Sequence, residues 1–137
     1  NSGSRFISRS DSSGTHAAEM LIWTKSGLDP TSFSGSWYLE SGQGMGPSLN
    51  IATSLGGYTL TDRSSWLRFQ NKANHTILYE NAQELRNDYS MILVNHARCQ
   101  NQDYESAKSL YDWLKSAEAA KLISSYQINN TNVFYVD

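Results

Sequence analysis

Cysteine and charge are both scarce in this sequence. Cys99 is the single cysteine among 137 residues, which excludes an internal disulfide and a zinc site built from cysteines. Charged residues make up 18% of the chain, and 11 basic against 13 acidic residues give a net charge of −2. A chain with this balance of charges lacks the basic surface that would attract nucleic acid or an anionic membrane, so we expect neither as a partner.

Long apolar runs and catalytic motifs are missing as well. The longest aliphatic run, residues 91–94, is too short for a membrane-spanning helix or the apolar part of a signal peptide, so we expect neither in these residues. No G-x-S-x-G motif is present, and His16, His75 and His96 are scattered without the spacing of a metal site. A hydrolase that uses Ser13 is therefore disfavoured. We expect a binding protein rather than an enzyme, with no cofactor and no bound cation.

Neutral polar and aromatic side chains are abundant instead. The chain has 21 Ser, 11 Asn and 8 Thr, and its 4 Trp, 8 Tyr and 4 Phe supply material for a core. A length of 137 residues suits one domain or one lobe of a larger protein, and the polar surface favours a secreted location. In a secreted protein Cys99 is either free or has lost its partner. Glycosylation sequons begin at Asn74 and Asn129 and matter only if a eukaryotic secretory pathway makes the protein.

The spacing of apolar residues predicts alternating short strands and helices. Strands are expected at residues 5–8, 58–61, 76–80 and 89–95, and the last has the continuous apolar run of a strand covered on both faces. Helices are expected at residues 16–26, from Pro47 to Leu55, after a cap at Asp62, at 104–116, and at 117–125 after a cap at Ser116. Residues 31–46 are expected to be a loop whose Trp37, Tyr38 and Leu39 pack over a sheet edge. The alternation predicts an α/β fold, a three-layer sandwich with a mixed sheet.

The segment between the first strand and the first helix has the residue types of an anion-binding turn. Amides in the first turn of a helix lack intrahelical partners and attract anions. Gly14 allows close approach of the backbone to a ligand, and Ser13 and Thr15 add hydroxyl groups. Arg9 adds a charged fork that Asp11, two residues away, is placed to orient. The alternative is that Ser13 or Thr15 only caps the helix while Arg9 and Asp11 are solvated.

Glycines precede a second helix at residues 42–47. This segment is not a dinucleotide-binding motif, because Pro47 stands where a third Gly or Ala is needed. It is not a Walker loop either, because no Lys-Ser or Lys-Thr follows. Two readings remain open: a flexible turn that leads into the helix, or a second set of backbone N–H donors that face the first.

Taken together, the chain has a series of motifs at residues 6–16, Trp37-Tyr38, Glu40, 42–46, 49–52, 58–63, Trp66-Leu67, Phe69, 91–95 and 112–118. In order and spacing these motifs resemble the tungstate-binding receptors of ABC transporters. The resemblance spans nearly all of the chain. It implies the second lobe of a type II periplasmic-binding-protein-like fold, with the lobe and its hinge strands at residues 1–95. Residues 96–137 would be a C-terminal helical segment that returns to a first lobe, and that lobe is absent from this sequence.

The resemblance also implies a function and a ligand set. The protein would be a periplasmic or extracellular receptor that binds tungstate or molybdate, both oxyanions, and delivers the anion to an ABC permease. Arg9 would supply charge, Ser13 and Thr15 hydroxyl groups, and Gly14 and Thr15 amides, while Asp11 orients Arg9. Weaker candidates for the same site are Ser8, Met45, Gly46 and Thr61.

Two departures from the family, and the alternatives, complete this interpretation. Ser10 stands where the family usually has Gly. The first lobe carries a Thr-Thr-Thr-Ser turn in the family, so its absence removes about half of the donor set, and we expect weak binding by this chain alone. The alternatives are a molybdate or phosphate receptor, or a secreted binding protein that retains the fold without a role in transport.

Overall fold

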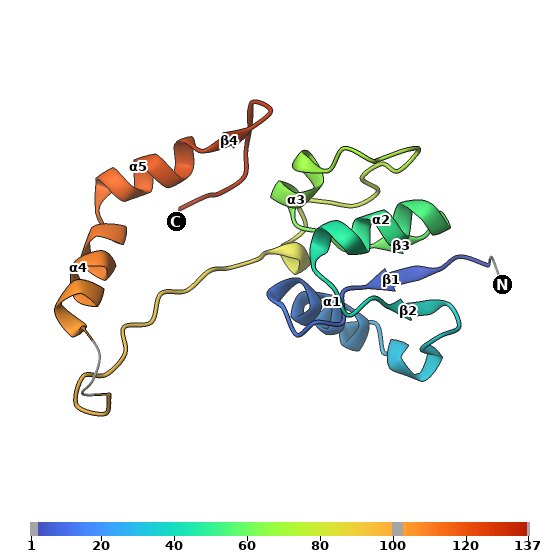
Figure 1. Ribbon diagram of the computed structural model, residues 1–137, viewed down its shortest axis with the longest axis horizontal. Helices are drawn as coiled ribbons and strands as arrows, with labels where there is room; N and C mark the ends of the chain where they lie inside the picture. Colours follow the sequence, from blue (N-terminus) through green and yellow to red (C-terminus); the bar gives the residue numbers. More distant parts are fainter. Residues whose placement is uncertain (1–2, 100–102, 137) are drawn as a thin grey trace. The chain divides into compact units, whose positions relative to one another are not determined.

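The computed structural model describes residues 3–99 and 103–136, which form two compact units (Figure 1). The boundary between the units lies between Asn87 and Asp88. Unit 1 holds a sheet with helices, and unit 2 holds two helices followed by a short hairpin. The expected α/β class is confirmed. None of the helices in the described ranges is long and apolar enough to cross a bilayer.

A parallel sheet of three strands forms the centre of unit 1. β1 (Phe6–Ser8) lies between β2 (Tyr38–Glu40) and β3 (Tyr58–Thr59), and it pairs in parallel with both. Parallel neighbours require a crossover, and the chain crosses over through a helix after β1 and again after β2. The expectation of a mixed sheet is therefore wrong for unit 1, whose described strands all run in one direction.

Each strand of the sheet is followed by a helix. These helices are α1 (Gly14–Lys25), α2 (Met45–Leu55) and α3 (Arg63–Arg68). Pro47 is the third residue of α2 and not its first, because the helix begins after Gly44. Gly56 ends α2 in the left-handed conformation, with a φ of 60°, and Asp62 caps α3 by accepting a hydrogen bond from the Ser65 amide at 2.8 Å, both as expected.

The two longer helices cover opposite faces of the sheet. On one face, the ring of Phe6 meets that of Trp23 in α1 edge-on, with centroids 5.2 Å apart. Side chains alternate along a strand, so the buried Ile7 points to the other face, where α2 contacts β1. Leu49 and Ala52 are buried residues of α2. Right-handed crossovers produce this layering, because the chain steps from β1 to β2 and then back across β1 to β3. The three-layer arrangement agrees with the prediction.

Residues 31–46 are not the continuous loop that their Ser and Gly content predicts. They contain most of a 3-10 helix, η1 (Pro30–Phe33), and all of β2. Tyr38 has no exposed surface, so this short edge strand belongs to the core rather than packing over it. Hydrogen bonds to β1 create the strand, and three residues are too few to show a period in the sequence.

The strands expected at residues 76–80 and 89–95 are not formed. Between them lies only a short 3-10 helix, η2 (Gln83–Leu85). Ile92, in the middle of the apolar run, is 87% exposed. A strand exists through hydrogen bonds to a neighbour, and no strand in the described residues pairs with either segment.

Unit 2 contains α4 (Tyr104–Leu114) and α5 (Ala117–Ser125). Ser116 caps α5 by accepting a hydrogen bond from the Ala119 amide at 3.2 Å, as expected. A hairpin of β4 (Gln127–Ile128) and β5 (Thr131–Asn132) follows, which the sequence analysis did not predict. The sequon residue Asn129 lies in its turn with Asn130, and both have positive φ angles, as two-residue hairpin turns require. The other sequon residue, Asn74, is exposed in unit 1.

Candidate functional site

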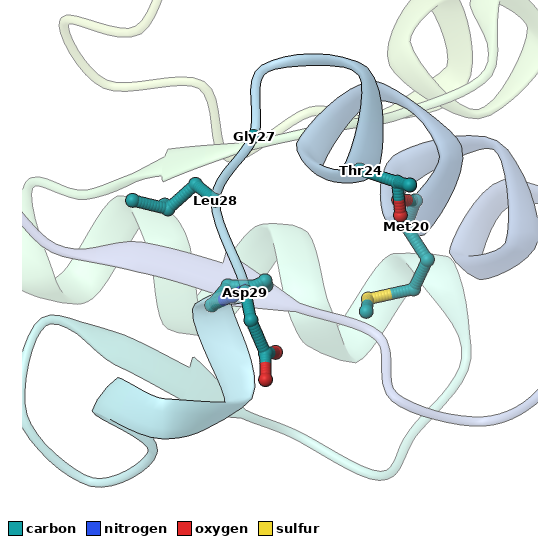
Figure 2. Close-up of a pocket in the computed structure, with 6 residues that line it drawn as sticks. Met20, Thr24, Gly27, Leu28 and Asp29 are labelled. Atoms are coloured by element: carbon teal, nitrogen blue, oxygen red, sulfur yellow. The ribbon is translucent and has the colours of Figure 1, made fainter.

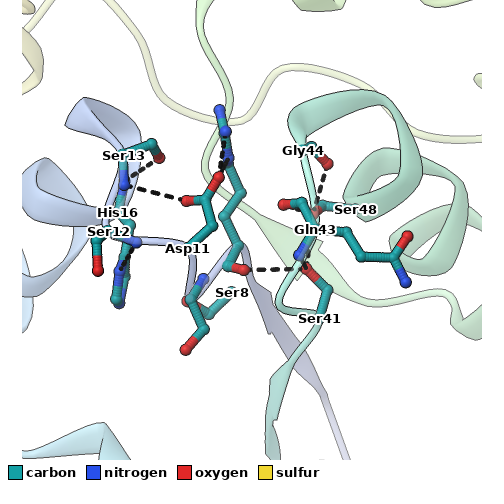
Figure 3. Close-up of polar contacts among 11 residues, drawn as sticks. Ser8, Asp11, Ser12, Ser13, His16, Ser41, Gln43, Gly44 and Ser48 are labelled. Atoms are coloured by element: carbon teal, nitrogen blue, oxygen red, sulfur yellow. Dashed lines mark hydrogen bonds and ion pairs between the residues drawn. The ribbon is translucent and has the colours of Figure 1, made fainter.

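The carboxyl ends of β1 and β2 bring the two predicted turns side by side. Ser8 and Glu40, the last residues of the two strands, lie opposite each other in register. The amide of Ser41 donates to the carbonyl of Ser8 at 2.9 Å, and the Ser41 hydroxyl donates to the carbonyl of Arg9 at 3.3 Å (Figure 3). The segments that precede α1 and α2 therefore meet at one edge of the sheet, which is where open α/β folds bind ligands.

Residues 9–13, which we call the arginine turn, are held together by a pair of opposite charges. The Nε of Arg9 donates to Oδ2 of Asp11 at 3.1 Å, and Nη2 of the guanidinium donates to the same oxygen. The other carboxylate oxygen of Asp11 accepts the amide of Ser13 at 3.2 Å. Both charged side chains are mostly buried, 17% exposed for Arg9 and 20% for Asp11, so the solvated alternative does not hold.

The pairing with Asp11 leaves one side of the Arg9 guanidinium open. Hydrogen bonding from Ser13, followed by the hydrogen bond and charge of Arg9, lowers the pKa of Asp11 to about 2, so the carboxylate is ionised at neutral pH. Asp11 takes up the Nε side of the guanidinium. The Nη1 group of Arg9 has no partner among the described residues, so its N–H groups remain available to a ligand.

The first turn of α1 combines a cap with free donors. The Ser13 hydroxyl oxygen accepts the amide of His16 at 3.3 Å, so the capping alternative is correct for Ser13. The amides of Gly14 and Thr15 precede the first intrahelical bond, and within the described ranges nothing accepts from them. Capping and anion binding are therefore compatible here. The Nδ1 of His16 accepts the amide of Ser12 at 3.2 Å, so this nitrogen is not paired with the Ser13 hydroxyl as a nucleophile's base would be.

The start of α2 offers a second pair of amides. Gly44 caps α2 without a side chain, and the amides of Met45 and Gly46 have no acceptor in the part of the chain that the structure describes. The turn before them is fixed by the buried Ser48, whose hydroxyl lies 2.8 Å from that of Ser41 and 3.0 Å from the Gly44 carbonyl. The turn is therefore held in place, which favours the donor reading over the flexible one.

Two of the weaker candidates use their hydroxyl groups within the protein. The hydroxyl of Ser8 has no exposed surface and donates to Oε2 of Glu19 at 2.9 Å. The hydroxyl of Thr61 donates to the carbonyl of Asp62 at 3.2 Å. Ser8 therefore supports the arginine turn, and Glu19, which accepts its hydroxyl, is a supporting residue that the sequence did not predict. The only sequence signal for Glu19 was its position four residues before Trp23, on the buried side of a helix.

A groove of about 270 Å³ lies away from these turns (Figure 2). It is lined by Met20, Thr24, Gly27, Leu28, Asp29 and Pro30. These residues surround the C-terminal end of α1, whereas the arginine turn adjoins its N-terminal end, and a helix of 12 residues separates the two ends by about 18 Å. The groove is therefore not part of the candidate anion site.

In the described ranges, no three His, Cys, Asp or Glu residues are grouped so as to hold a metal ion.

A parallel sheet with helix N-termini and a preorganised arginine at its carboxyl edge defines an α/β domain suited to bind an anion. Comparison with known families agrees with this class. The chain belongs to the PBP superfamily, because the model of the PBP superfamily domain matches residues 1–118. The α/β lobe expected from the sequence is thus confirmed at the level of the family.

Similar proteins carry more specific names. The chain is 37% identical over 122 residues to the tungstate-binding protein TupA of Peptoclostridium acidaminophilum, covering 89% of this chain and 42% of that protein. It is 35% identical over 136 residues to TupA of Campylobacter jejuni, covering 96% of this chain and 50% of the relative. The solved structure of TupA from Desulfovibrio alaskensis aligns with a TM-score of 0.76 and 33% identity, over 97% of this chain and 54% of that one. The chain spans about half the length of these relatives.

Proposed function

We propose that this chain is the second lobe of an extracytoplasmic receptor that binds tungstate and delivers it to an ABC transporter. The observation that carries the proposal is the meeting of two helix N-termini beside Arg9. These helices start with four amides, at Gly14, Thr15, Met45 and Gly46, that have no acceptor among the residues the structure describes. Relatives named tungstate-binding proteins support tungstate as the anion. We propose binding and transport rather than catalysis.

The chemistry of the site matches a desolvated dianion. Removing tungstate from water costs free energy unless dipoles and charge replace its hydration shell. Each helix N-terminus carries about half a positive charge, so the two together offset about one of the two charges of the ligand. Arg9 adds hydrogen-bond donors, while its charge is offset by the ionised Asp11. Neutral dipoles of this kind require no excess of basic residues, which agrees with the net charge of −2. A receptor for cargo taken up from outside is placed in the periplasm or outside the cell.

The partner that completes the site is a first lobe of the same protein. We assign residues 1–95 to the second lobe with its hinge strands and residues 96–137 to a segment that returns to the first lobe. The exposed apolar run supports this assignment: Met91, Ile92 and Val94 are 45%, 87% and 52% exposed and have no strand partner among the described residues. The first lobe would supply about half of the ligand's donors, and an ABC permease would receive the complete receptor.

Titration calorimetry of the two-lobed protein tests this proposal. Tungstate, molybdate, sulfate and phosphate are titrated into the wild type, Arg9→Ala and the matched control Arg5→Ala. Arg5 is exposed at the other end of β1, next to its first residue. We expect Arg9→Ala to weaken tungstate binding about ten- to a hundredfold, as loss of a charged hydrogen-bond donor does, and Arg5→Ala to leave it unchanged. Undiminished affinity in Arg9→Ala would overturn the site, and tighter binding of molybdate or phosphate would replace tungstate as the cargo.

The isolated 137-residue chain gives a second measurement. We expect weak or no tungstate binding, because half of the donor set lies in the other lobe. Submicromolar affinity of the isolated chain would show that one lobe suffices. A receptor role also requires that the loaded protein stimulates ATP hydrolysis by its permease complex. Binding without stimulation would favour the alternative, a secreted binding protein that has no part in transport.

A further inference from the structure

Ser10, in the middle of the arginine turn, has a backbone conformation that favours glycine. Its φ angle is 47°, within the left-handed region that residues with a Cβ rarely adopt. Ser10 directly follows Arg9, so its backbone conformation sets the direction in which the turn leaves the arginine. Some interaction must therefore stabilise a conformation that serine does not favour on its own.

Two hydrogen bonds stabilise Ser10 in this conformation. Its amide donates to the buried hydroxyl of Ser8 at 3.2 Å, and its own hydroxyl donates to Oε1 of Glu40 at 3.0 Å. Glu40 is the last residue of β2, so the sheet fixes its backbone opposite Ser8. Its second carboxylate oxygen accepts the hydroxyl of Ser34, which orients the carboxylate toward the turn.

The charge of Glu40 cannot be what this residue contributes to an anion site. Hydrogen bonds from Ser34 first and then Ser10 lower the pKa of the Glu40 carboxyl, so it is ionised at neutral pH. A carboxylate beside an anion site repels the ligand, so its negative charge does not favour binding. What Glu40 provides to the arginine turn is a hydrogen-bond acceptor.

We propose that Glu40 is a positioning residue for the anion site. It holds Ser10 in the left-handed conformation that a glycine adopts unaided, and thereby fixes the backbone of Arg9 beside the free amides of α1. Neither Ser10 nor Glu40 contacts the ligand in this assignment. The inference rests on the proposed function, because the arginine turn is the part of the site that Glu40 would position.

Four variants separate positioning from charge in the two-lobed protein. Glu40→Ala removes both the acceptor and the charge, whereas Glu40→Gln removes the charge and keeps an acceptor oxygen. Ser10→Gly removes the need for the contact, and the double variant Ser10→Gly/Glu40→Ala tests whether glycine replaces Glu40. The four are compared by calorimetric titration with tungstate.

We expect Glu40→Ala to weaken tungstate binding about tenfold, the fold-change of one net hydrogen bond. Glu40→Gln should bind as the wild type does or more tightly, because the repulsion is gone and the acceptor stays. The tungstate affinities of Ser10→Gly and the double variant should agree within about twofold, because Glu40 has no hydroxyl at position 10 to accept once glycine stands there. Equal affinities of Glu40→Ala and Glu40→Gln, or a tenfold loss in the double variant relative to Ser10→Gly, would overturn the inference.

Hydrogen exchange of the amide at position 10 gives a readout that needs no ligand. In the 137-residue chain, the Ser10 amide should exchange about tenfold faster in Glu40→Ala than in the wild type, because opening of the turn exposes its hydrogen bond to Ser8. In Glu40→Gln the rate should equal that of the wild type. If the wild type binds no tungstate while this exchange pattern is found, the proposed function fails and the hold of Glu40 on Ser10 stands. Unchanged exchange in Glu40→Ala would contradict that hold whatever the binding result.

Discussion

The hydroxyl of Tyr38 donates to Oε1 of Glu19 at 2.8 Å, which joins β2 to α1 inside unit 1. Glu19 is 3% exposed, and its carboxylate also accepts the hydroxyl of Ser8 at 2.9 Å and the indole N–H of Trp23 at 3.2 Å. Burial, more than the neighbouring Glu19, raises the pKa of Tyr38 to about 12, so the phenol remains a donor. A buried carboxylate is tolerated only with such donors, and two of the three come from the strands that carry both turns, Ser8 from β1 and Tyr38 from β2.

Removing the Tyr38 hydroxyl should destabilise the protein. Tyr38→Phe leaves one donor fewer to a buried carboxylate, and we expect the free energy of unfolding to fall by about 2 kcal/mol. Tyr58→Phe is the matched control, because Tyr58 is 51% exposed, and it should change stability by less than about 0.5 kcal/mol. Urea unfolding followed by tryptophan fluorescence measures both. Equal stabilities of the two variants would mean that the contact to Glu19 contributes nothing.

Two serine caps should differ in their effect on binding. Ser13 caps α1 at the anion site, and Ser116 caps α5 in unit 2. Each change to alanine should cost about 1 kcal/mol of stability through the lost cap. Only Ser13→Ala should also weaken tungstate binding, which is measured by calorimetry on the two-lobed protein. A comparable loss of affinity in Ser116→Ala would show that binding follows stability rather than local contacts.

A side chain at position 57 has no room. A Cβ on Gly57 would overlap Cδ1 of Ile7 and lie 3.1 Å from the carbonyl oxygen of Arg5, which accepts the amide of Tyr58. Gly57→Ala should therefore lower the free energy of unfolding by about 2 kcal/mol, as overpacking of a core does. Gly46→Ala is the control for stability, since nothing lies within 4 Å of its Cβ position. A Gly57→Ala variant as stable as this control would contradict the close packing of β1 against β3.

The Asp11 carboxyl should titrate in strong acid. Its pKa falls from 3.8 to about 2 on folding, so its pairing stabilises the folded state above pH 3.8 and this contribution is lost as the pH falls through about 2. The carboxyl carbon of Asp11, followed by NMR, reports the titration directly. Arg9→Ala should raise the pKa only part of the way to 3.8, because hydrogen bonding from Ser13 is the larger cause. A wild-type titration near 3.8 would refute the arrangement of the turn.

The arginine turn was predictable because its signals are local. Ser13, Gly14 and Thr15 lie in one turn at the start of α1, and Asp11 reaches Arg9 across two residues, so sequence distance is a good guide to contact. The caps at Asp62 and Ser116 were predictable for the same reason. The supports of the site were not, because Glu40 lies 30 residues from Ser10 and meets it only through the register of β2 on β1.

Strands proved hardest to predict, because they depend on partners. Residues 38–40 form a strand without any periodic pattern, since β1 offers them an edge. Residues 91–94 have the apolar pattern of a central strand, yet no strand in the described ranges pairs with them. Apolar character reports that a segment favours burial, whereas a strand requires a second segment whose position the local sequence does not contain.

The missing side-chain cap at the start of α2 has a consequence for order in that helix. Gly44 provides no oxygen, so a bound oxyanion would itself accept the amides of Met45 and Gly46 and act as the N-cap. Ligand occupancy would then be thermodynamically linked to the stability of the first turn of α2, because the anion supplies the acceptor that Gly44 lacks. α1, which has its own cap at Ser13, would stay equally ordered in both states.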